Sequence, residues 1–199
     1  MAARGVLTVV KVGGGLAREA GPRVLRALCA QIAEAGARHP LLVVPGGAQF
    51  ADVVRAHDRR FTLRAQTAHW MAILAMDQYA YVLADRISGA VIVEEPGEIR
   101  EALSGGKIPI IAPARWMRSA DALPHSWEVT SDSIAAFVAG ALGAGRLALI
   151  KPAVSDHSVD GYFRTALPAG MPHLIVSWER LEQLSDWLSE RTAAAAPPE

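Results

Sequence analysis

A lysine and three adjacent glycines follow the first apolar run of the chain, at Lys11 and at Gly13 to Gly15. A second pair, Gly46 and Gly47, follows the next apolar run. Each turn would place backbone N–H groups and the start of a helix at the end of a strand, an arrangement that binds anions. Glycine also lets the backbone approach a phosphate closely, because it has no Cβ atom. The two turns together predict a phosphate-binding site.

The spacing of these residues excludes two common nucleotide-binding loops. A Walker A loop has its lysine after the glycines and before Ser or Thr, whereas Lys11 precedes them and the Gly-Lys pair at 106–107 is followed by isoleucine. A dinucleotide-binding loop needs the pattern GxGxxG, and counting from Gly13 puts Arg18 at its last position. The site is therefore of another kind.

Two further charged residues stand near the predicted ends of helices and strands. Thr130, Ser131 and Asp132 precede an alanine-rich helical stretch, and all three residue types favour the N-cap position. We expect ordinary capping from the first two, whereas Asp132 either caps the helix or orients a lysine that holds phosphate. Lys151 ends the apolar run LALI, so we expect it on the same sheet edge as Lys11 and both glycine turns.

These residues are positioned by short apolar runs that alternate with longer stretches of helical periodicity. The alternation predicts an α/β fold, a three-layer αβα sandwich with a mostly parallel central sheet. The expected strands are 6–12, 41–44, 90–93, 108–112, 147–150 and 173–177. The expected helices are 22–37, 48–57, 64–88, 98–104, 131–143 and 179–191. Segments 113–128 and 151–172 mix Pro or Gly with polar residues and are expected to be loops.

The composition restricts the class of protein. The chain has 199 residues and is 51% hydrophobic, so we expect a single domain over 1–191 and a flexible tail over 192–199. Its 20 basic and 20 acidic residues cancel, which argues against nucleic acid or membrane partners and favours a small molecule. With no signal-peptide or membrane-spanning pattern and a single cysteine, Cys29, we expect a cytoplasmic protein. The histidines lack paired ligand spacing, so no protein-bound metal is expected.

The helical stretch 64–88 is apolar on several sides, which is typical of a buried or interfacial helix. It is long enough to project beyond the sheet, so we expect a homodimer that packs through it. The polar residues around it are candidates for an acceptor pocket. Arg59 or Arg60 would bind a phosphate and Asp77 a substrate ammonium. His69 is either a substrate-binding or a structural residue, and Trp70 or Trp116 would form an aromatic wall.

Four segments, taken in order, resemble the amino acid kinase family, which includes acetylglutamate, aspartate and uridylate kinases. They are KVGGG, VVPGGAQFAD, VTSDSIAA and LALIK, and they extend over nearly the whole chain. Residues 57–85, with HSWEVTSDSIAAF and PHLIVSWERL, more narrowly resemble the short subfamily of [5-(aminomethyl)furan-3-yl]methyl phosphate kinases. Those enzymes serve methanofuran or methylofuran biosynthesis in one-carbon metabolism. The resemblance implies that ATP and acceptor lie along the carboxyl ends of the strands.

The resemblance also implies roles for the glycine turns. Gly13, Gly14 and Gly15 would supply backbone donors to the transferring phosphoryl group. Gly46 and Gly47 would contact the reacting end of the acceptor, and Gln49 is a further substrate-binding candidate. Many relatives have serine where this chain has Gly15, which removes a hydroxyl near the phosphates.

The charged residues receive roles by the same resemblance. Lys11 would neutralise the transferring phosphoryl group, and Asp132 would hold the lysine side chains in place rather than act as a base. Larger relatives take a second phosphate-binding lysine from a GMxxK segment, which this chain lacks. Lys151 is the expected substitute.

The implied activity is that of an ATP- and Mg²⁺-dependent kinase whose acceptor is itself a phosphate monoester. Such an acceptor oxygen is already anionic near neutral pH, so a site of glycines and lysines needs no general base. Mg²⁺ would bridge the nucleotide phosphates and take few protein ligands. Two alternatives stay open: a related kinase acting on a carboxylate or carbamate, and a non-catalytic nucleotide- or oxyanion-binding protein on the same fold.

Overall fold

The computed structural model describes residues 5–15, 21–155 and 158–190, so the expected tail at 192–199 lies outside the described residues. Within those ranges a six-stranded sheet forms, and its strand order is β3-β4-β2-β1-β5-β6. Every neighbouring pair is parallel. The predicted parallel sheet is therefore confirmed. The strands are β1 (Thr8–Val12), β2 (Leu41–Pro45), β3 (Ala90–Val93), β4 (Ile108–Ile111), β5 (Arg146–Lys151) and β6 (His173–Ser177).

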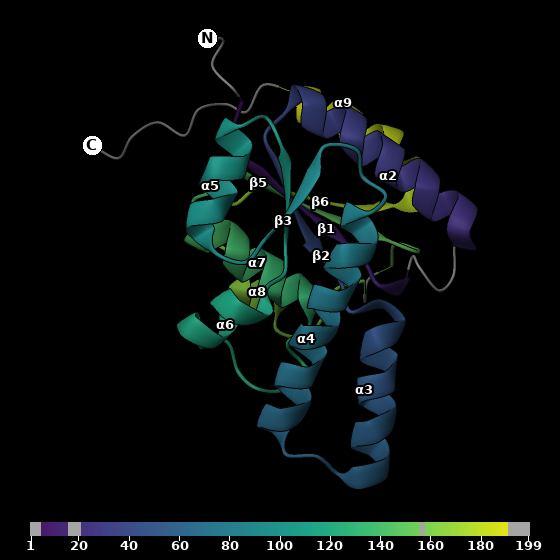
Figure 1. Ribbon diagram of the computed structural model, residues 1–199, viewed down its shortest axis with the longest axis vertical. Coiled ribbons are helices and arrows are strands. Elements are labelled where there is room, and N and C mark those ends of the chain that lie inside the picture. The colour runs from purple at the N-terminus through teal and green to yellow at the C-terminus, as the bar shows by residue number, and fades with distance from the viewer. Residues whose placement is uncertain (1–4, 16–20, 156–157, 191–199) are drawn as a thin grey trace.

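Helices cover both faces of this sheet. Figure 1 shows α2 (Gly21–Arg38) and α9 (Glu182–Ser189) on one side, and α5 (Pro96–Ser104) and α7 (Ser131–Ala141) on the other. The three-layer arrangement expected from the sequence is thus confirmed. The described residues also contain α3 (Ala48–Phe61), α4 (Ala65–Ala84), α6 (Ala114–Ala120), α8 (Phe163–Ala166) and the short 3₁₀ helix η1 (Trp178–Arg180).

Two of these helices lie in segments that were expected to be loops. Helix α6 occupies part of 113–128, and α8 occupies part of 151–172. They contain seven and four residues. A helix of one or two turns is too short to show a 3.6-residue repeat, so the apolar pattern could not reveal it.

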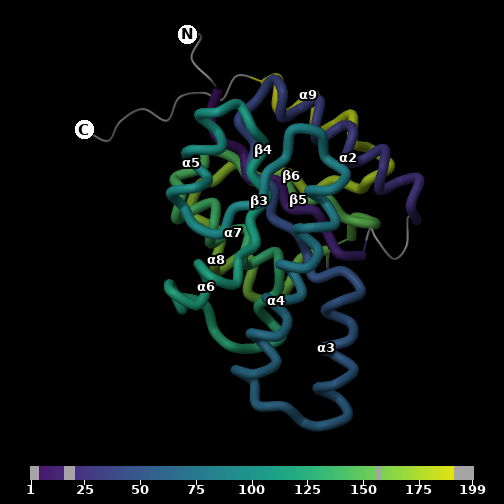
Figure 2. The backbone as a smooth tube through the Cα atoms, viewed as in Figure 1, coloured from purple at the N-terminus to yellow at the C-terminus, as the bar shows by residue number. Residues whose placement is uncertain are grey.

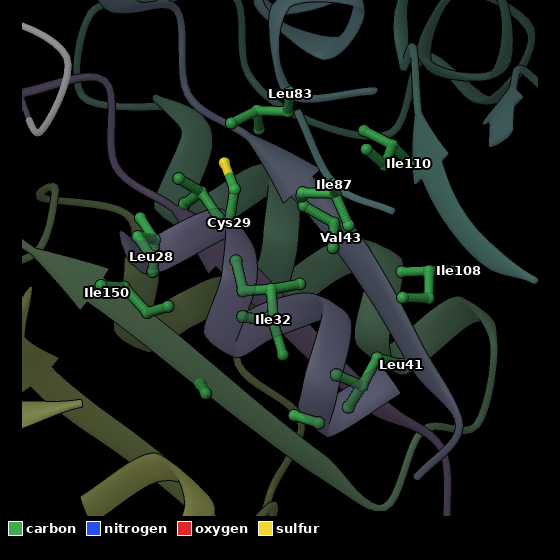
Figure 3. Close-up of a cluster of buried hydrophobic side chains, with 14 of the residues drawn as sticks. Leu28, Cys29, Ile32, Leu41, Val43, Leu83, Ile87, Ile108, Ile110 and Ile150 are labelled. Atoms are coloured by element: carbon green, nitrogen blue, oxygen red, sulfur yellow. The ribbon is translucent and has the colours of Figure 1, made fainter. Parts of the chain in front are cut away.

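The alternating side chains of the strands divide the core into two clusters, one on each face of the sheet. Val10 and Val12 pack with the cluster under α2, and Val9 packs with the cluster under α7. Figure 3 shows the first cluster, with Leu28, Cys29 and Ile32 of α2 beside residues of β2, β4 and β5. Burial raises the pKa of the Cys29 thiol to about 11, so this cysteine is a protonated core residue at neutral pH.

Helices α3 and α4 form an antiparallel pair that extends beyond the sheet (Figures 1 and 2). The chain reverses between them at Thr62, whose φ of 50° lies in the left-handed region. The carboxyl half of α4 is anchored under the sheet, where Tyr79 and Leu83 are fully buried. No helix among the described residues combines the length and apolar character needed to span a membrane.

Candidate active site

The two glycine turns lie against one another at the carboxyl ends of β1 and β2. A Cβ atom on Gly14 would lie 2.3 Å from the backbone nitrogen of Ala48, and one on Gly46 would lie 2.5 Å from the nitrogen of Gly14. The Gly46 N–H donates to the carbonyl of Val12 at 2.8 Å. Such backbone-to-backbone contact leaves no room for a side chain at either glycine. Ala48 itself has a φ of 46°, a strained value for alanine at the start of α3.

The glycines of the first turn differ in their surroundings. The Gly13 N–H donates to the carbonyl of Ile150 at 3.0 Å, and a Cβ on Gly13 would lie 2.8 Å from the same oxygen. This amide therefore joins the turn to β5, and its hydrogen is already donated to a backbone carbonyl. Gly14 and Gly15 line the adjacent cavity, so they are the members of the predicted donor set that face a ligand.

Lys11, Asp132 and Lys151 form a buried ionic cluster. The Nζ atom of Lys11 lies 2.8 Å from Oδ1 of Asp132, and Nζ of Lys151 donates to Oδ2 of the same carboxylate at 2.5 Å. The three residues are only 3%, 3% and 8% exposed. The structure thus brings together the three charged residues that the sequence placed at one sheet edge.

The alternation of side chains explains why they meet. Lys11 shares a face of β1 with Val9, and Lys151 shares a face of β5 with Leu149. Val9 and Leu149 both pack in the cluster under α7. Since β1 and β5 are neighbours, with Lys11 opposite Leu149, the two lysines project toward the first turn of α7, which carries Asp132.

The charges of this cluster depend on one another. Burial alone would raise the pKa of Asp132, but the ammonium groups of Lys11 and Lys151 outweigh it and hold that pKa below its usual range. Burial and the nearby charge of Lys11 lower the pKa of Lys151 to about 8, against the opposing effect of Asp132. The carboxylate is therefore ionised and bound to two lysines, and the cluster carries a net positive charge that favours an anion.

Asp160 caps α7, a role that the sequence did not reveal. Its Oδ2 accepts the Thr130 N–H at 2.9 Å, the Thr130 hydroxyl at 2.7 Å and the Ser133 N–H at 3.1 Å. Its own N–H donates to Oδ2 of Asp132 at 3.3 Å. Neither Thr130 nor another residue of the expected capping group makes a side-chain cap in the described structure. Asp160 follows no recognisable cap pattern, because it reaches the helix from a distant loop.

A cavity of about 170 Å³ opens beside the glycine turns. One wall is the face of α3 that carries Ala48, Ala51, Asp52 and Arg55. The facing wall is formed by α4, and a third side is formed by the segment that leads into α7. Thr130 and Ser131, the neighbours of Asp132, also line it, so the cavity adjoins the ionic cluster.

Among the described residues, the arginine that lines this cavity is Arg55. The predicted Arg59 and Arg60 are exposed in the last turn of α3 and do not line it, and Gln49 is exposed as well. Positions 48, 51, 52 and 55 follow the i, i+3, i+4, i+7 spacing of one helix face. Continuing that spacing from the second glycine turn would have identified Arg55.

Asp77 and His69 have different positions. Asp77 does not line the cavity; its Oδ1 accepts the Ala114 N–H at 3.0 Å, at the start of α6. Burial raises the pKa of Asp77 to about 6. His69 is buried and lines the cavity, where it stacks on His125 with ring centres 4.7 Å apart. Burial, and to a smaller extent the charge of His125, lower the pKa of His69 to about 4, so this ring is neutral at pH 7.

Of the tryptophans that the structure describes, the one that lines the cavity is Trp127 rather than Trp70 or Trp116. Trp70 packs edge-on to His69, with ring centres 5.1 Å apart, and Trp116 packs near Phe137. The described residues contain no group of three or more His, Cys, Asp or Glu side chains arranged to hold a metal ion. The one carboxylate of the ionic cluster is bound by lysines.

Comparisons with known proteins identify the family of this chain. Residues 6–152 match the amino acid kinase family. A relative from Methanocaldococcus jannaschii, [5-(aminomethyl)furan-3-yl]methyl phosphate kinase, is 30% identical over 155 residues, which cover 78% of this chain and 67% of the relative.

Solved structures show the same architecture. The UMP kinase of Bacillus anthracis aligns with a TM-score of 0.67 and 14% identity over 92% of this chain and 93% of its own. The uridylate kinase of Archaeoglobus fulgidus aligns with a TM-score of 0.56 and 16% identity over 78% of this chain and 69% of its own. At these identities the likeness establishes the fold, and the family match over most of the sequence establishes descent. The chain is therefore a kinase of the amino acid kinase family.

Proposed function

We propose that this kinase transfers a phosphoryl group from ATP to the phosphate of a small phosphorylated acceptor, [5-(aminomethyl)furan-3-yl]methyl phosphate, to form the diphosphate. The product would serve methanofuran or methylofuran biosynthesis. The relative from Methanocaldococcus jannaschii supports this choice of acceptor. The observation that carries the proposal is the buried Lys11–Asp132–Lys151 cluster, which adjoins a cavity lined by glycine amides, an arginine and a tryptophan.

The chemistry follows from the charges of these residues. An oxygen of the acceptor phosphate forms a bond to the γ-phosphorus, and the bond from that phosphorus to the β–γ bridging oxygen breaks, so ADP leaves. The acceptor phosphate is largely a dianion at pH 7, since the second pKa of a phosphate monoester is about 6. No residue has to remove a proton. Lys11 and Lys151 would stabilise the charge on the transferring oxygens, while Asp132 holds both ammonium groups in place.

ATP and Mg²⁺ fit this site in different ways. The buried ammonium groups and the turn at Gly14 and Gly15 suit the nucleotide phosphates. The described residues offer no carboxylate cage for Mg²⁺. That cation would instead be held by phosphate oxygens and water, which it prefers to retain.

A direct assay tests the acceptor. The purified protein is incubated with MgATP and the aminomethylfuran phosphate, and we expect ADP together with a new diphosphate signal in the ³¹P NMR spectrum. Parallel reactions contain N-acetylglutamate, carbamate and UMP. Transfer only to a carboxylate or carbamate would replace the proposal with that alternative, and ATP binding without transfer to any acceptor would indicate a binding protein.

Activity should fall in alkaline solution, because the pKa of Lys151 is about 8. Its ammonium is charged below that pH and is lost above it, so phosphate binding weakens as the pH rises. We expect kcat/KM for MgATP to fall about tenfold per pH unit well above pH 8, as for any single group that must be protonated. In Lys151→Arg the side chain stays charged, and the fall should move to higher pH. A flat wild-type profile from pH 7 to pH 9.5 would contradict the role of Lys151.

We also propose that the protein is a homodimer that packs through α3 and α4. An apolar groove of about 300 Å³ runs along this pair, lined by Phe50, Val53, Val54, Met71, Leu74, Ala75 and Gln78. Val53 is 58% exposed and Leu74 is 40% exposed. A second copy, related by a two-fold axis, offers the same uncharged groove in the antiparallel direction.

Leu74→Glu should therefore give a monomer, because it would bury charge in that contact. Light scattering coupled to size-exclusion chromatography measures the mass. The exposed Val6, which is remote from the groove, gives the matched control Val6→Glu, which should stay dimeric. A wild-type mass equal to one chain would contradict the dimer.

A further inference from the structure

Trp127 is held at the cavity by contacts that α3 supplies. Its Nε1–H donates to Oδ2 of Asp58 at 2.6 Å. The guanidinium carbon of Arg55 lies 4.8 Å from the centre of its ring, a cation–π distance. The half-buried ring also packs against a small apolar cluster between α3 and α4. These contacts fix the orientation of the indole.

Asp58 joins the end of α3 to the segment that carries Trp127. Its Oδ1 accepts the Leu63 N–H at 3.1 Å, while its Oδ2 accepts the indole N–H. Its carbonyl accepts the N–H of Thr62, the residue at the turn between α3 and α4. Both carboxylate oxygens are therefore in use. Asp58 does not line the cavity, so it acts on a ligand through Trp127.

The indole and Arg55 face a part of the cavity that is distant from the transferring phosphate. An α-helix rises 1.5 Å per residue, so α3 carries Arg55 about 12 Å beyond Gly47, and Asp52 about 7.5 Å beyond it. An acceptor whose phosphate meets the glycine turns would place its amine near the level of Asp52 and its ring just before that level, and the guanidinium of Arg55 reaches back to Asp52. In an extended aminomethylfuran phosphate, the phosphorus and the amine nitrogen are separated by roughly 7 Å, given bond lengths near 1.5 Å.

Among the described residues of this wall, the charges of Arg55 and Asp52 offset each other. Nη1 of Arg55 lies 3.4 Å from Oδ1 of Asp52, and both residues line the cavity. A guanidinium that stacks on an indole and has a carboxylate beside it presents a flat face rather than an uncompensated cation. Such a surface suits a planar ring with little net negative charge, and it does not suit a second phosphate.

We propose that Trp127 and Arg55 form the wall that binds the ring of the acceptor, and that Asp58 is the positioning residue that sets this wall. The inference rests on the proposed phosphotransferase function. It makes the ring, and not only the phosphate, a determinant of acceptor choice.

The test compares the aminomethylfuran phosphate with a ring-less ω-aminoalkyl phosphate of the same length. Trp127→Leu should raise KM for the ring acceptor about tenfold, which is the order of an aromatic stacking contact. It should leave KM for MgATP, kcat and the constants for the ring-less acceptor within about twofold. Asp58→Leu should behave in the same way. Asp58→Asn keeps one oxygen, which can accept from the indole N–H or from the Leu63 N–H but not from both, so it should recover only part of the loss.

Matched controls separate this effect from general loss of packing. Trp178 is also half-buried, but it packs on the other face of the sheet, so Trp178→Leu should leave both acceptor constants unchanged. Calorimetric binding of the ring acceptor without ATP gives a readout independent of turnover. Trp127→Leu should weaken that binding about tenfold as well. Thermal unfolding of each variant verifies that it is folded.

The outcomes distinguish the two proposals. Wild-type transfer to the furan phosphate with an unchanged KM in Trp127→Leu would overturn the wall and leave the function intact. Equal losses for the ring and ring-less acceptors would also overturn it. If the wild type transfers to no phosphate monoester, the proposed function fails. Calorimetry then decides the wall by itself, since absent or Trp127-independent binding of the ring compound would overturn it.

Discussion

Lys11→Ala is expected to lower kcat by roughly a thousandfold, the size of effect seen when one preorganised cation or donor is removed from a phosphoryl- or acyl-transfer site. The reason is geometric. Lys11 reaches the site from the carboxyl end of β1, is 3% exposed and is held by Asp132. Neither water nor a mobile side chain can therefore replace its charge. Steady-state kinetics with saturating MgATP and acceptor measure the loss.

The fold should tolerate this change better than the activity does. After removal of Lys11, the Asp132 carboxylate still has Lys151 at 2.5 Å, so no buried charge is left without a partner. Lys11→Met fills more of the lost volume and should show the same kinetic defect. Because the charge of Lys11 lowers the pKa of Lys151, that pKa should rise in Lys11→Met, and the alkaline fall in activity should move upward.

A matched control is available on the far edge of the sheet. Lys107 is exposed just before β4, and Lys107→Ala should leave kcat unchanged. If Lys11→Ala turned over at near the wild-type rate, the assignment of the phosphoryl site to this cluster would be wrong. A variant that only bound nucleotide more weakly would favour a binding protein over a kinase.

Asp132→Ala should destabilise the fold by about 3 kcal/mol, the usual cost of removing one partner from a buried ionic group. Two ammonium groups would then lie buried beside each other with no anion between them. One lysine would have to release its proton or move toward solvent. Urea denaturation followed by circular dichroism measures the free energy of unfolding, and turnover should fall with it because neither lysine keeps its position.

A double-mutant cycle of Asp132 and Lys151 tests this explanation. Lys151→Met placed on the Asp132→Ala background removes one of the two unbalanced charges, so part of the lost stability should return. Asp132→Asn keeps the shape of the side chain and should still be destabilised, because it lacks the negative charge. Normal stability of Asp132→Ala would show that the two lysines do not depend on this carboxylate.

The sequence was sufficient for the sheet and its glycine turns, because their signals are local. A strand alternates its side chains and a helix repeats every 3.6 residues, so apolar runs and periodic stretches identify themselves. Parallel strands end at one edge, which is enough to predict that Lys11 and Lys151 lie on the same sheet edge, whereas their meeting at Asp132 depends on the pairing of β1 with β5. The same locality hid α6 and α8, since a helix of seven or four residues is too short to repeat.

The tertiary structure alone decided which side chains complete the site. Asp160 caps α7 from a loop 30 positions beyond Thr130, and Asp58 fixes Trp127 across 69 positions. Contacts of this kind depend on the paths of irregular segments, which carry no period in the sequence. Arg55 and Arg59 lie one turn apart on nearly the same face of α3, and Arg55 lines the cavity while Arg59 does not because Arg59 lies about 6 Å farther along the helix axis. Local patterns therefore located the glycine turns and the charged residues beside them, and long-range packing decided which side chains line the adjacent cavity.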